Sequence, residues 1–128
     1  MVSLLLLSHS AKVVEGTRDV ALQMAGDAEI AIVGGTKDGS LGADFDETLA
    51  TLRKLVQKGD VIVLSDLGSA RMTGQMAAEA LDVELQKRVH LCDAALVEGG
   101  LVAAIAIAAG QDTEAILEQL QEYVLNKD

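Results

Sequence analysis

Two residues of this sequence, His9 and Asp66, could carry out nucleophilic chemistry together. Each is separated by one serine from the end of an apolar run that is typical of a buried strand, Leu4–Leu7 for the histidine and Val61–Leu64 for the aspartate. An imidazole can act as a nucleophile, a base or a metal ligand. A carboxylate that accepts from one ring nitrogen fixes the tautomer, so the other nitrogen is presented unprotonated. His9 and Asp66 are therefore the candidate catalytic pair.

The pair can meet only if a sheet brings the ends of the two runs together. Four apolar runs are each followed by a polar or glycine-containing turn and a helical pattern. They begin about 30 residues apart, which is the length of a βαβ unit. Such repeats predict an α/β fold with an open parallel sheet of about four strands, in the order 2-1-3-4, and helices on both faces. The expected strands are Val2–Leu7, Glu29–Val33, Val61–Leu64 and Arg88–Cys92.

The carboxyl ends of parallel strands share one edge of the sheet, and ligands bind there where the crossover direction changes. His9 and Asp66 lie together at that edge if the first and third strands are neighbours. Glycines let the backbone approach an oxyanion, and the N-termini of the following helices offer N–H groups to phosphoryl oxygens. Phosphoryl transfer needs mostly positioning and charge stabilisation. The candidate phosphoryl-binding residues of these turns are Ser10, Gly35, Thr36 and Ser69.

Helical segments follow each expected strand. The segment after the second strand begins with Asp44 as its cap, and Glu47 stands three residues later as in a capping box. Methionine at helical spacing is more often core than binding surface, so we expect Met72 and Met76 of the third helix to be buried. The first helix, from about Lys12 to Ala25, carries apolar residues at helical spacing, which are Val13, Val20 and Met24.

Composition bounds the class of protein. The net charge of −10 opposes binding to nucleic acid and to an anionic membrane surface. The 128 residues suit one domain, which we expect to span residues 1–128. The amino terminus lacks a signal-peptide pattern, and the apolar runs are too short to cross a bilayer. We therefore expect a soluble, cytoplasmic protein.

Two further residues are expected to be structural. The single cysteine, Cys92, allows neither an internal disulfide nor a cysteine-based zinc cluster, and we expect it to be a buried small hydrophobe. His90 lies inside an apolar strand run, which favours a structural role. His9 is then the one credible reactive imidazole. A metal-binding role for it is not expected, because Asp66 is its only obvious second ligand.

Five motifs resemble the phosphotransfer subunits of bacterial phosphoenolpyruvate-dependent dihydroxyacetone kinases, a family grouped with the mannose-type IIA domains of the sugar phosphotransferase system. The resemblance runs from residue 2 to about residue 125, and its most specific stretch begins at Asp66. The motifs are Leu7-Ser8-His9-Ser10, Val33-Gly34-Gly35-Thr36, Leu41-Gly42-Ala43-Asp44, Ser65-Asp66-Leu67-Gly68-Ser69-Ala70-Arg71-Met72 and Val97-Glu98-Gly99-Gly100.

This resemblance implies a phosphotransferase with a phosphohistidine intermediate. The phosphoryl group is expected on Nε2 of His9, with Asp66 as the carboxylate partner. The implied donor is the phosphohistidine of the carrier protein HPr, and the implied acceptor is ADP held on the nucleotide-binding subunit of dihydroxyacetone kinase. The chain itself would bind no cofactor and neither nucleotide nor sugar as a free substrate. Members of the family are expected to be homodimers.

Some roles stay open beside the resemblance. Lys12 and Arg71 are candidates for contacting the phosphoryl group or a partner's phosphate, and ordinary surface charge is the equal alternative. Some relatives carry fused HPr-like and enzyme I-like domains, whereas this chain ends at Asp128 and is expected to use separate donors. Two other functions remain: a mannose-type transport domain that passes phosphate to a IIB protein, and a binding module whose partner affinity is set by phosphorylation.

Overall fold

Strand β1 (Val2–Ser8) is the centre of the sheet because its leucines are covered on both faces. Each of Leu4, Leu5, Leu6 and Leu7 is fully buried. The strand pairs in parallel with β2 (Ile30–Gly34) on one side and with β3 (Asp60–Ser65) on the other, and β4 (Val89–Cys92) completes the sheet beside β3. The order β2-β1-β3-β4 confirms the predicted parallel sheet, and each predicted strand boundary lies within one residue of the observed one.

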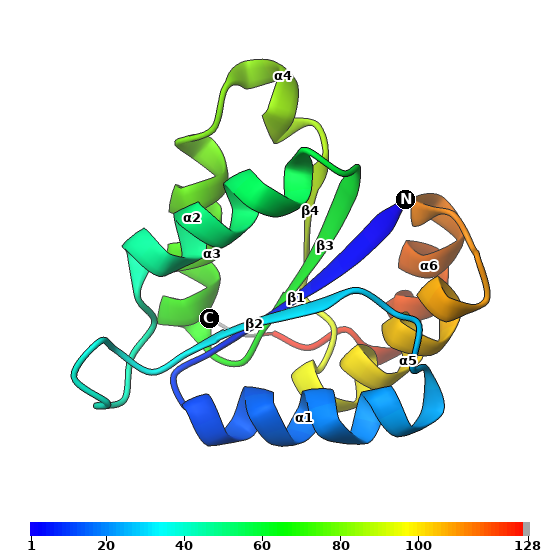
Figure 1. The fold of residues 1–128 in the computed structure, drawn as a ribbon, viewed down its shortest axis with the longest axis horizontal. Helices are drawn as coiled ribbons and strands as arrows, with labels where there is room; N and C mark the ends of the chain where they lie inside the picture. Colours follow the sequence, from blue (N-terminus) through cyan, green and yellow to red (C-terminus); the bar gives the residue numbers. More distant parts are fainter. Residues whose placement is uncertain (127–128) are drawn as a thin grey trace.

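The computed structural model describes residues 1–126, so the last two residues of the expected domain, 127 and 128, lie outside it. Helices cover both faces of the sheet, as predicted (Figure 1). One layer is α1 (Ala11–Met24), α5 (Leu96–Ala108) and α6 (Thr113–Leu120), followed by the short 3-10 turn Gln121–Tyr123. The other layer is α2 (Phe45–Val56), α3 (Gly68–Glu79) and the one-turn helix α4 (Val83–Gln86), which the sequence did not predict.

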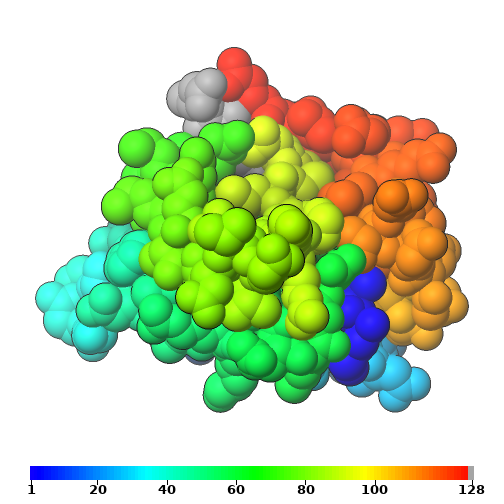
Figure 2. Space-filling model, turned by 90° about the horizontal axis from the view of Figure 1, so that it is seen from above, coloured from blue at the N-terminus to red at the C-terminus, as the bar shows by residue number. Residues whose placement is uncertain are grey.

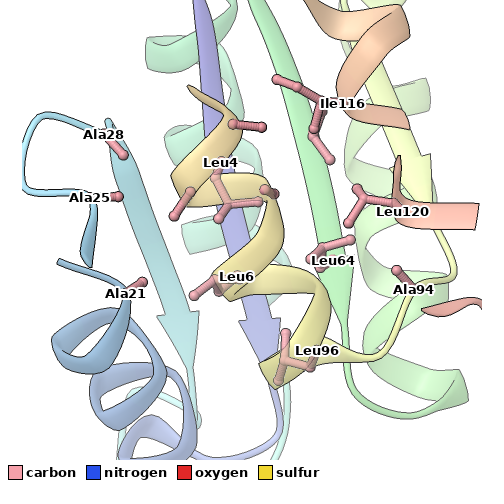
Figure 3. Packing of buried hydrophobic residues seen from close by; sticks show 14 of the residues in the cluster. Leu4, Leu6, Ala21, Ala25, Ala28, Leu64, Ala94, Leu96, Ile116 and Leu120 are labelled. Atoms are coloured by element: carbon pink, nitrogen blue, oxygen red, sulfur yellow. The ribbon is translucent and has the colours of Figure 1, made fainter. Parts of the chain in front are cut away.

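Strand alternation divides the buried side chains into two clusters, one for each layer. Leu4 and Leu6 pack with Leu64, Ile116 and Leu120 under α5 and α6, as Figure 3 shows. Leu5 and Leu7 belong to the cluster under α2 and α3. Because apolar residues fill both faces of the central strand, the residues that follow it start from a rigid base.

The apolar residues that stand at helical spacing in the first helix do not form its buried face. Val13, Val20 and Met24 are 41%, 51% and 52% exposed, and the buried residues of α1 are instead Val14, Thr17 and Ala21. The close approach of α5 explains the difference, because a Cβ added to Gly100 would lie 3.4 Å from the Thr17 methyl group. Small side chains therefore occupy the contact.

The predicted burial of two methionines is also wrong. Met72 and Met76 of α3 are 59% and 56% exposed. The buried face of this helix is made by Ala70, Gly74 and Ala77, and a Cβ added to Gly74 would lie only 3.2 Å from a Leu7 methyl group. A helix this close to the sheet has no room for long side chains, so its methionines point outward.

Of two smaller predictions, the cap of α2 is confirmed and the full burial of Cys92 is wrong. Asp44 caps α2 as predicted, because its side chain accepts a hydrogen bond from the Glu47 N–H at 3.1 Å. Cys92 is half-buried rather than buried, because β4 is an edge strand. None of the helices within residues 1–126 is long and apolar enough to cross a bilayer.

Candidate active site

Strand pairing brings His9 and Asp66 together at the carboxyl edge of the sheet. In the register of β1 and β3, Leu7 lies opposite Ser65, and the Asp66 N–H donates to the Leu7 carbonyl at 3.2 Å. The chain leaves both strands at the same level, so the two side chains meet although 57 positions separate them. The His9 ring nitrogen Nδ1 lies 3.0 Å from Asp66 Oδ1.

Four donors converge on the Asp66 carboxylate. Oδ1 accepts from His9 Nδ1 at 3.0 Å and from the Leu67 N–H at 2.7 Å. Oδ2 accepts from the Ser8 hydroxyl at 2.6 Å and from the His9 N–H at 3.0 Å. Burial by itself raises the pKa of Asp66, but the hydrogen bonds from Ser8, His9 and Leu67 outweigh it and lower that pKa below its ordinary value. The group is therefore a carboxylate at neutral pH.

This carboxylate decides which ring nitrogen of His9 can react. A carboxylate accepts hydrogen bonds and cannot donate, so Nδ1 carries the proton and Nε2 carries the lone pair. Nε2 lies in hydrogen-bonding contact with the hydroxyl of Ser69, which therefore donates to it. The His9 side chain is 27% exposed. The nucleophilic nitrogen Nε2 thus faces outward, while the hydrogen bond from Nδ1 to Asp66 holds the other side of the ring.

Ser8 is a residue of this site that sequence reasoning missed. Its side chain is fully buried, its hydroxyl donates to Asp66, and its Oγ accepts from the Ser10 N–H at 3.0 Å. The alternation Leu4, Leu6, Ser8 was the available signal, because it extends the buried face of β1 by one more residue.

The helices that begin beside His9 have open N-termini. The N-cap of α1 is Ser10 and that of α3 is Leu67, and within the described chain neither caps its helix with its side chain. The first turns of both helices also contain no acidic residue in this described part of the sequence. By contrast, Asp44 caps α2 and Asp112 caps α6. Two positive helix ends thus face the surroundings of His9, and such ends favour phosphoryl oxygens.

A loop from Gly35 to Gly42 lies beside the same turn and projects from the molecule in Figures 1 and 2, where it is cyan. The Gly42 N–H donates to the His9 carbonyl at 2.9 Å, with φ at +145°. Gly34, at the end of β2, lets the turn approach, because a Cβ there would lie 2.7 Å from the Ser10 carbonyl oxygen. The loop therefore buttresses the backbone of His9.

The two loop residues predicted to bind the phosphoryl group lie in different surroundings. Gly35 has φ at +77°, and a Cβ added to it would lie 3.7 Å from the Ala11 nitrogen at the start of α1. The Thr36 hydroxyl instead donates within the loop, to Asp38 at 2.5 Å. This bond and one from the Ser40 N–H lower the pKa of Asp38 to about 2.

Arg71 and Lys12 differ in their contacts. Arg71 Nε donates to Asp93 Oδ1 at 2.6 Å, which ties α3 to the residue after β4. The arginine is about one-third exposed and makes this ion pair at the carboxyl edge of the sheet. Lys12 is exposed in the first turn of α1.

The opposite edge of the sheet carries a second histidine–aspartate pair. His90 Nε2 lies 3.7 Å from Asp60 Oδ2, and this nitrogen makes no hydrogen bond within residues 1–126. Asp60 accepts a hydrogen bond from the Thr113 hydroxyl at 2.5 Å. An open hollow of about 700 Å³ lies at this edge and is lined in part by Asp60, Arg88 and Thr113. No group of three or more histidine, cysteine, aspartate or glutamate side chains among the described residues could hold a metal ion.

Comparisons with known proteins agree with the geometry. The family model described as PTS system fructose IIA component, EIIA-man, matches residues 3–119. A Listeria innocua protein named PEP-dependent dihydroxyacetone kinase 2, phosphoryl donor subunit DhaM, is 36% identical over 121 residues, which cover 94% of this chain and 97% of the relative. A Lactococcus lactis protein named PTS-dependent dihydroxyacetone kinase, phosphotransferase subunit DhaM, is 28% identical and covers 97% of each chain.

Relatives also differ in length. An Escherichia coli protein named PEP-dependent dihydroxyacetone kinase, phosphoryl donor subunit DhaM, is 34% identical over 121 residues, which cover 91% of this chain but only 26% of the relative. Among solved structures, one described as unknown function protein EF1359 has a TM-score of 0.88 at 34% identity and covers 98% of this chain and 96% of that one. The mannose/sorbose specific IIA subunit of Enterococcus faecalis has a TM-score of 0.53 at 22% identity, covering 98% and 94%, which indicates a shared fold.

Proposed function

The chain belongs to the EIIA-man family of PTS system fructose IIA components, and from this premise we propose that it relays a phosphoryl group through Nε2 of His9. The relatives named as phosphoryl donor subunits support a phosphotransferase role in a dihydroxyacetone kinase. The observation that carries the proposal is the orientation of the His9 ring. Its Nδ1 is hydrogen-bonded to the Asp66 carboxylate, which accepts four hydrogen bonds in all, and its Nε2 faces outward.

The first transfer runs from the phosphohistidine of HPr to His9. The lone pair of Nε2 forms a new N–P bond while the P–N bond of the donor breaks, and the donor imidazole keeps that electron pair. His9 needs no proton transfer in this step, because its proton is already on Nδ1. Asp66 stabilises the positive charge that the ring gains when Nε2 is bonded to phosphorus, through its hydrogen bond to Nδ1.

Ser69 and the helix ends would then receive the phosphoryl oxygens. The Ser69 hydroxyl lies at Nε2 in the free protein, so it must rotate away before phosphorus can bond there, and a phosphoryl oxygen is its nearest new acceptor. Backbone N–H groups at the start of α1 and α3, beside Ser10 and Ser69, supply further donors. Gly35, Thr36 and Arg71 remain secondary candidates. Thr36 and Arg71 would have to exchange their bonds to Asp38 and Asp93 to take part.

The second transfer delivers the group to ADP on the nucleotide-binding subunit of dihydroxyacetone kinase. A terminal phosphate oxygen of ADP attacks phosphorus, the N–P bond breaks, and the electron pair returns to Nε2. The names of the relatives support this acceptor over a sugar-transport IIB protein. We further propose a homodimer in the cytoplasm, one domain over residues 1–128, and no bound cofactor of its own.

The test is to incubate the chain with phosphoenolpyruvate, enzyme I and HPr, and then to locate any phosphate by intact mass and peptide mapping. We expect one acid-labile, base-stable phosphoryl group on the peptide that holds His9. Adding the ADP-loaded kinase subunit should remove it and produce ATP. Removal by a IIB protein instead would favour the transport function.

A stable phosphoprotein that passes its phosphate to neither acceptor would favour the phosphorylation-regulated binding module. No phosphorylation, with the donors shown to be active on another acceptor, would reject the relay.

A further inference from the structure

We propose that Ser8 is a positioning residue that fixes the orientation of the Asp66 carboxylate and, through it, the reactive tautomer of His9. The inference deepens the proposed function and rests on it for its kinetic part. Ser8 lies beneath the site on its protein side, since its side chain is fully buried at the last position of β1. No substrate could reach it there, so its effect on the reaction must pass through Asp66.

The Ser8 hydroxyl both donates and accepts a hydrogen bond. Its O–H donates to Asp66 Oδ2 at 2.6 Å, and its oxygen accepts from the Ser10 N–H at 3.0 Å. The turn on either side of His9 is thereby bound to the carboxylate that holds the imidazole. The serine joins the aspartate after β3 to the start of α1 within a single side chain.

The count of donors explains why the link matters. Each oxygen of Asp66 accepts two hydrogen bonds, so all four lone-pair directions of the carboxylate are occupied. Without the Ser8 hydroxyl, Oδ2 keeps only the His9 N–H, and the Ser10 N–H loses its acceptor. The carboxylate can then rotate, and Oδ1 no longer stays in line with Nδ1.

Threonine and cysteine separate hydrogen bonding from space filling. Ser8→Thr keeps a hydroxyl that can donate and accept at the same position. Ser8→Cys fills the volume, but a thiol is a weak donor and a weak acceptor. Ser3→Ala is the matched control, because Ser3 is also a buried serine of β1, 1% exposed, but lies near the amino end of the strand.

The experiment has one readout that needs no partner. Nitrogen-15 NMR of the unphosphorylated protein reports which ring nitrogen of His9 carries the proton. We expect wild type, Ser8→Thr and Ser3→Ala to hold the Nδ1–H tautomer, and Ser8→Ala and Ser8→Cys to show a mixture. Because Ser8 contributes to lowering the Asp66 pKa, we also expect that pKa to rise in the Ala and Cys variants.

The second readout is the rate of phosphorylation by HPr. We expect a loss of about 10-fold in Ser8→Ala and Ser8→Cys, the effect of one hydrogen bond to a charged group, with recovery in Ser8→Thr. Circular dichroism and thermal melts verify that each variant is folded.

Unchanged tautomers and rates in both Ser8→Ala and Ser8→Cys, equal to those of Ser3→Ala, would overturn the proposal. If wild type accepts no phosphate, the relay fails, while the NMR comparison still decides whether Ser8 positions the pair.

Discussion

Strand β3 begins with Asp60 and is followed at its other end by Asp66, and each aspartate lies beside one of the two histidines of the chain. At the carboxyl edge the ring nitrogen and the carboxylate oxygen are 3.0 Å apart, and at the amino edge they are 3.7 Å apart. Each edge therefore carries one histidine–aspartate pair, and the two pairs differ in the hydrogen-bond donors that surround the aspartate.

The difference teaches which feature makes a histidine reactive. Asp66 holds Nδ1 of His9 and leaves Nε2 at the surface, next to Ser69. At the amino edge the nitrogen that faces Asp60 is Nε2 of His90, and it is shielded from solvent. A nucleophile needs one nitrogen fixed and the other open, and only the His9 pair meets both conditions within residues 1–126.

Removing each histidine is the strongest test of this contrast. We expect His9→Ala to lower phosphorylation by HPr by a factor of about 1,000 or more, because the variant lacks the nitrogen that is proposed to form the N–P bond. His90→Ala should transfer at the wild-type rate. Phosphate incorporation measured by intact mass checks both variants. Equal loss in the two would show that the edges of the sheet are not distinct in function.

Changing each aspartate to the isosteric amide sharpens the contrast. In Asp66→Asn one acceptor oxygen becomes an NH₂ donor that faces other donors, so the tautomer of His9 is no longer fixed. We expect the transfer rate to fall by about 100-fold or more, the size of a lost acid–base partner. Asp60→Asn should leave the rate unchanged. A rapid-quench time course with phospho-HPr gives both rates.

Acid should lower the free energy of unfolding by protonating Asp66 at the carboxyl edge of the sheet. The folded-state pKa of this group is lowered, so its ionisation stabilises the fold above the ordinary carboxyl pKa, about 3.9. That contribution is lost as pH falls through the lower, folded-state pKa. Urea unfolding between pH 6 and pH 2 should show a steeper loss of stability in wild type than in Asp66→Asn. Parallel pH curves for the two proteins would contradict this assignment.

The smallest effect is expected from Thr113→Val at the amino edge. The substitution removes the hydroxyl that donates to Asp60 and keeps the shape of the side chain. We expect the free energy of unfolding to fall by about 1 kcal/mol, without any change in phosphoryl transfer. Urea denaturation and the HPr assay measure the two quantities. A slower transfer would connect the two edges and weaken the contrast.

Sequence patterns predicted the sheet and the meeting of His9 with Asp66, because topology alone decides which strand ends are neighbours. They did not predict the partner of Arg71, because Asp93 follows a different strand, β4, and its approach to α3 depends on the tertiary fold. Met72 and Met76 were misplaced because spacing shows which residues share a helix face, but not how close that face comes to the sheet. The role of Ser8 needed atomic distances, since a serine at a strand end otherwise looks like a turn residue.

The central place of β1 in the sheet also affects how often the backbone around His9 opens to solvent. Its amides lie in the middle of the sheet, so their hydrogens should exchange with solvent only when the whole domain opens, whereas the loop from Gly35 to Gly42 can open locally. The turn that carries His9 is attached to that slowest-opening strand. We therefore expect the His9 backbone to keep its position for as long as β1 stays paired, even when a local opening of the loop breaks the hydrogen bond from the Gly42 N–H to the His9 carbonyl.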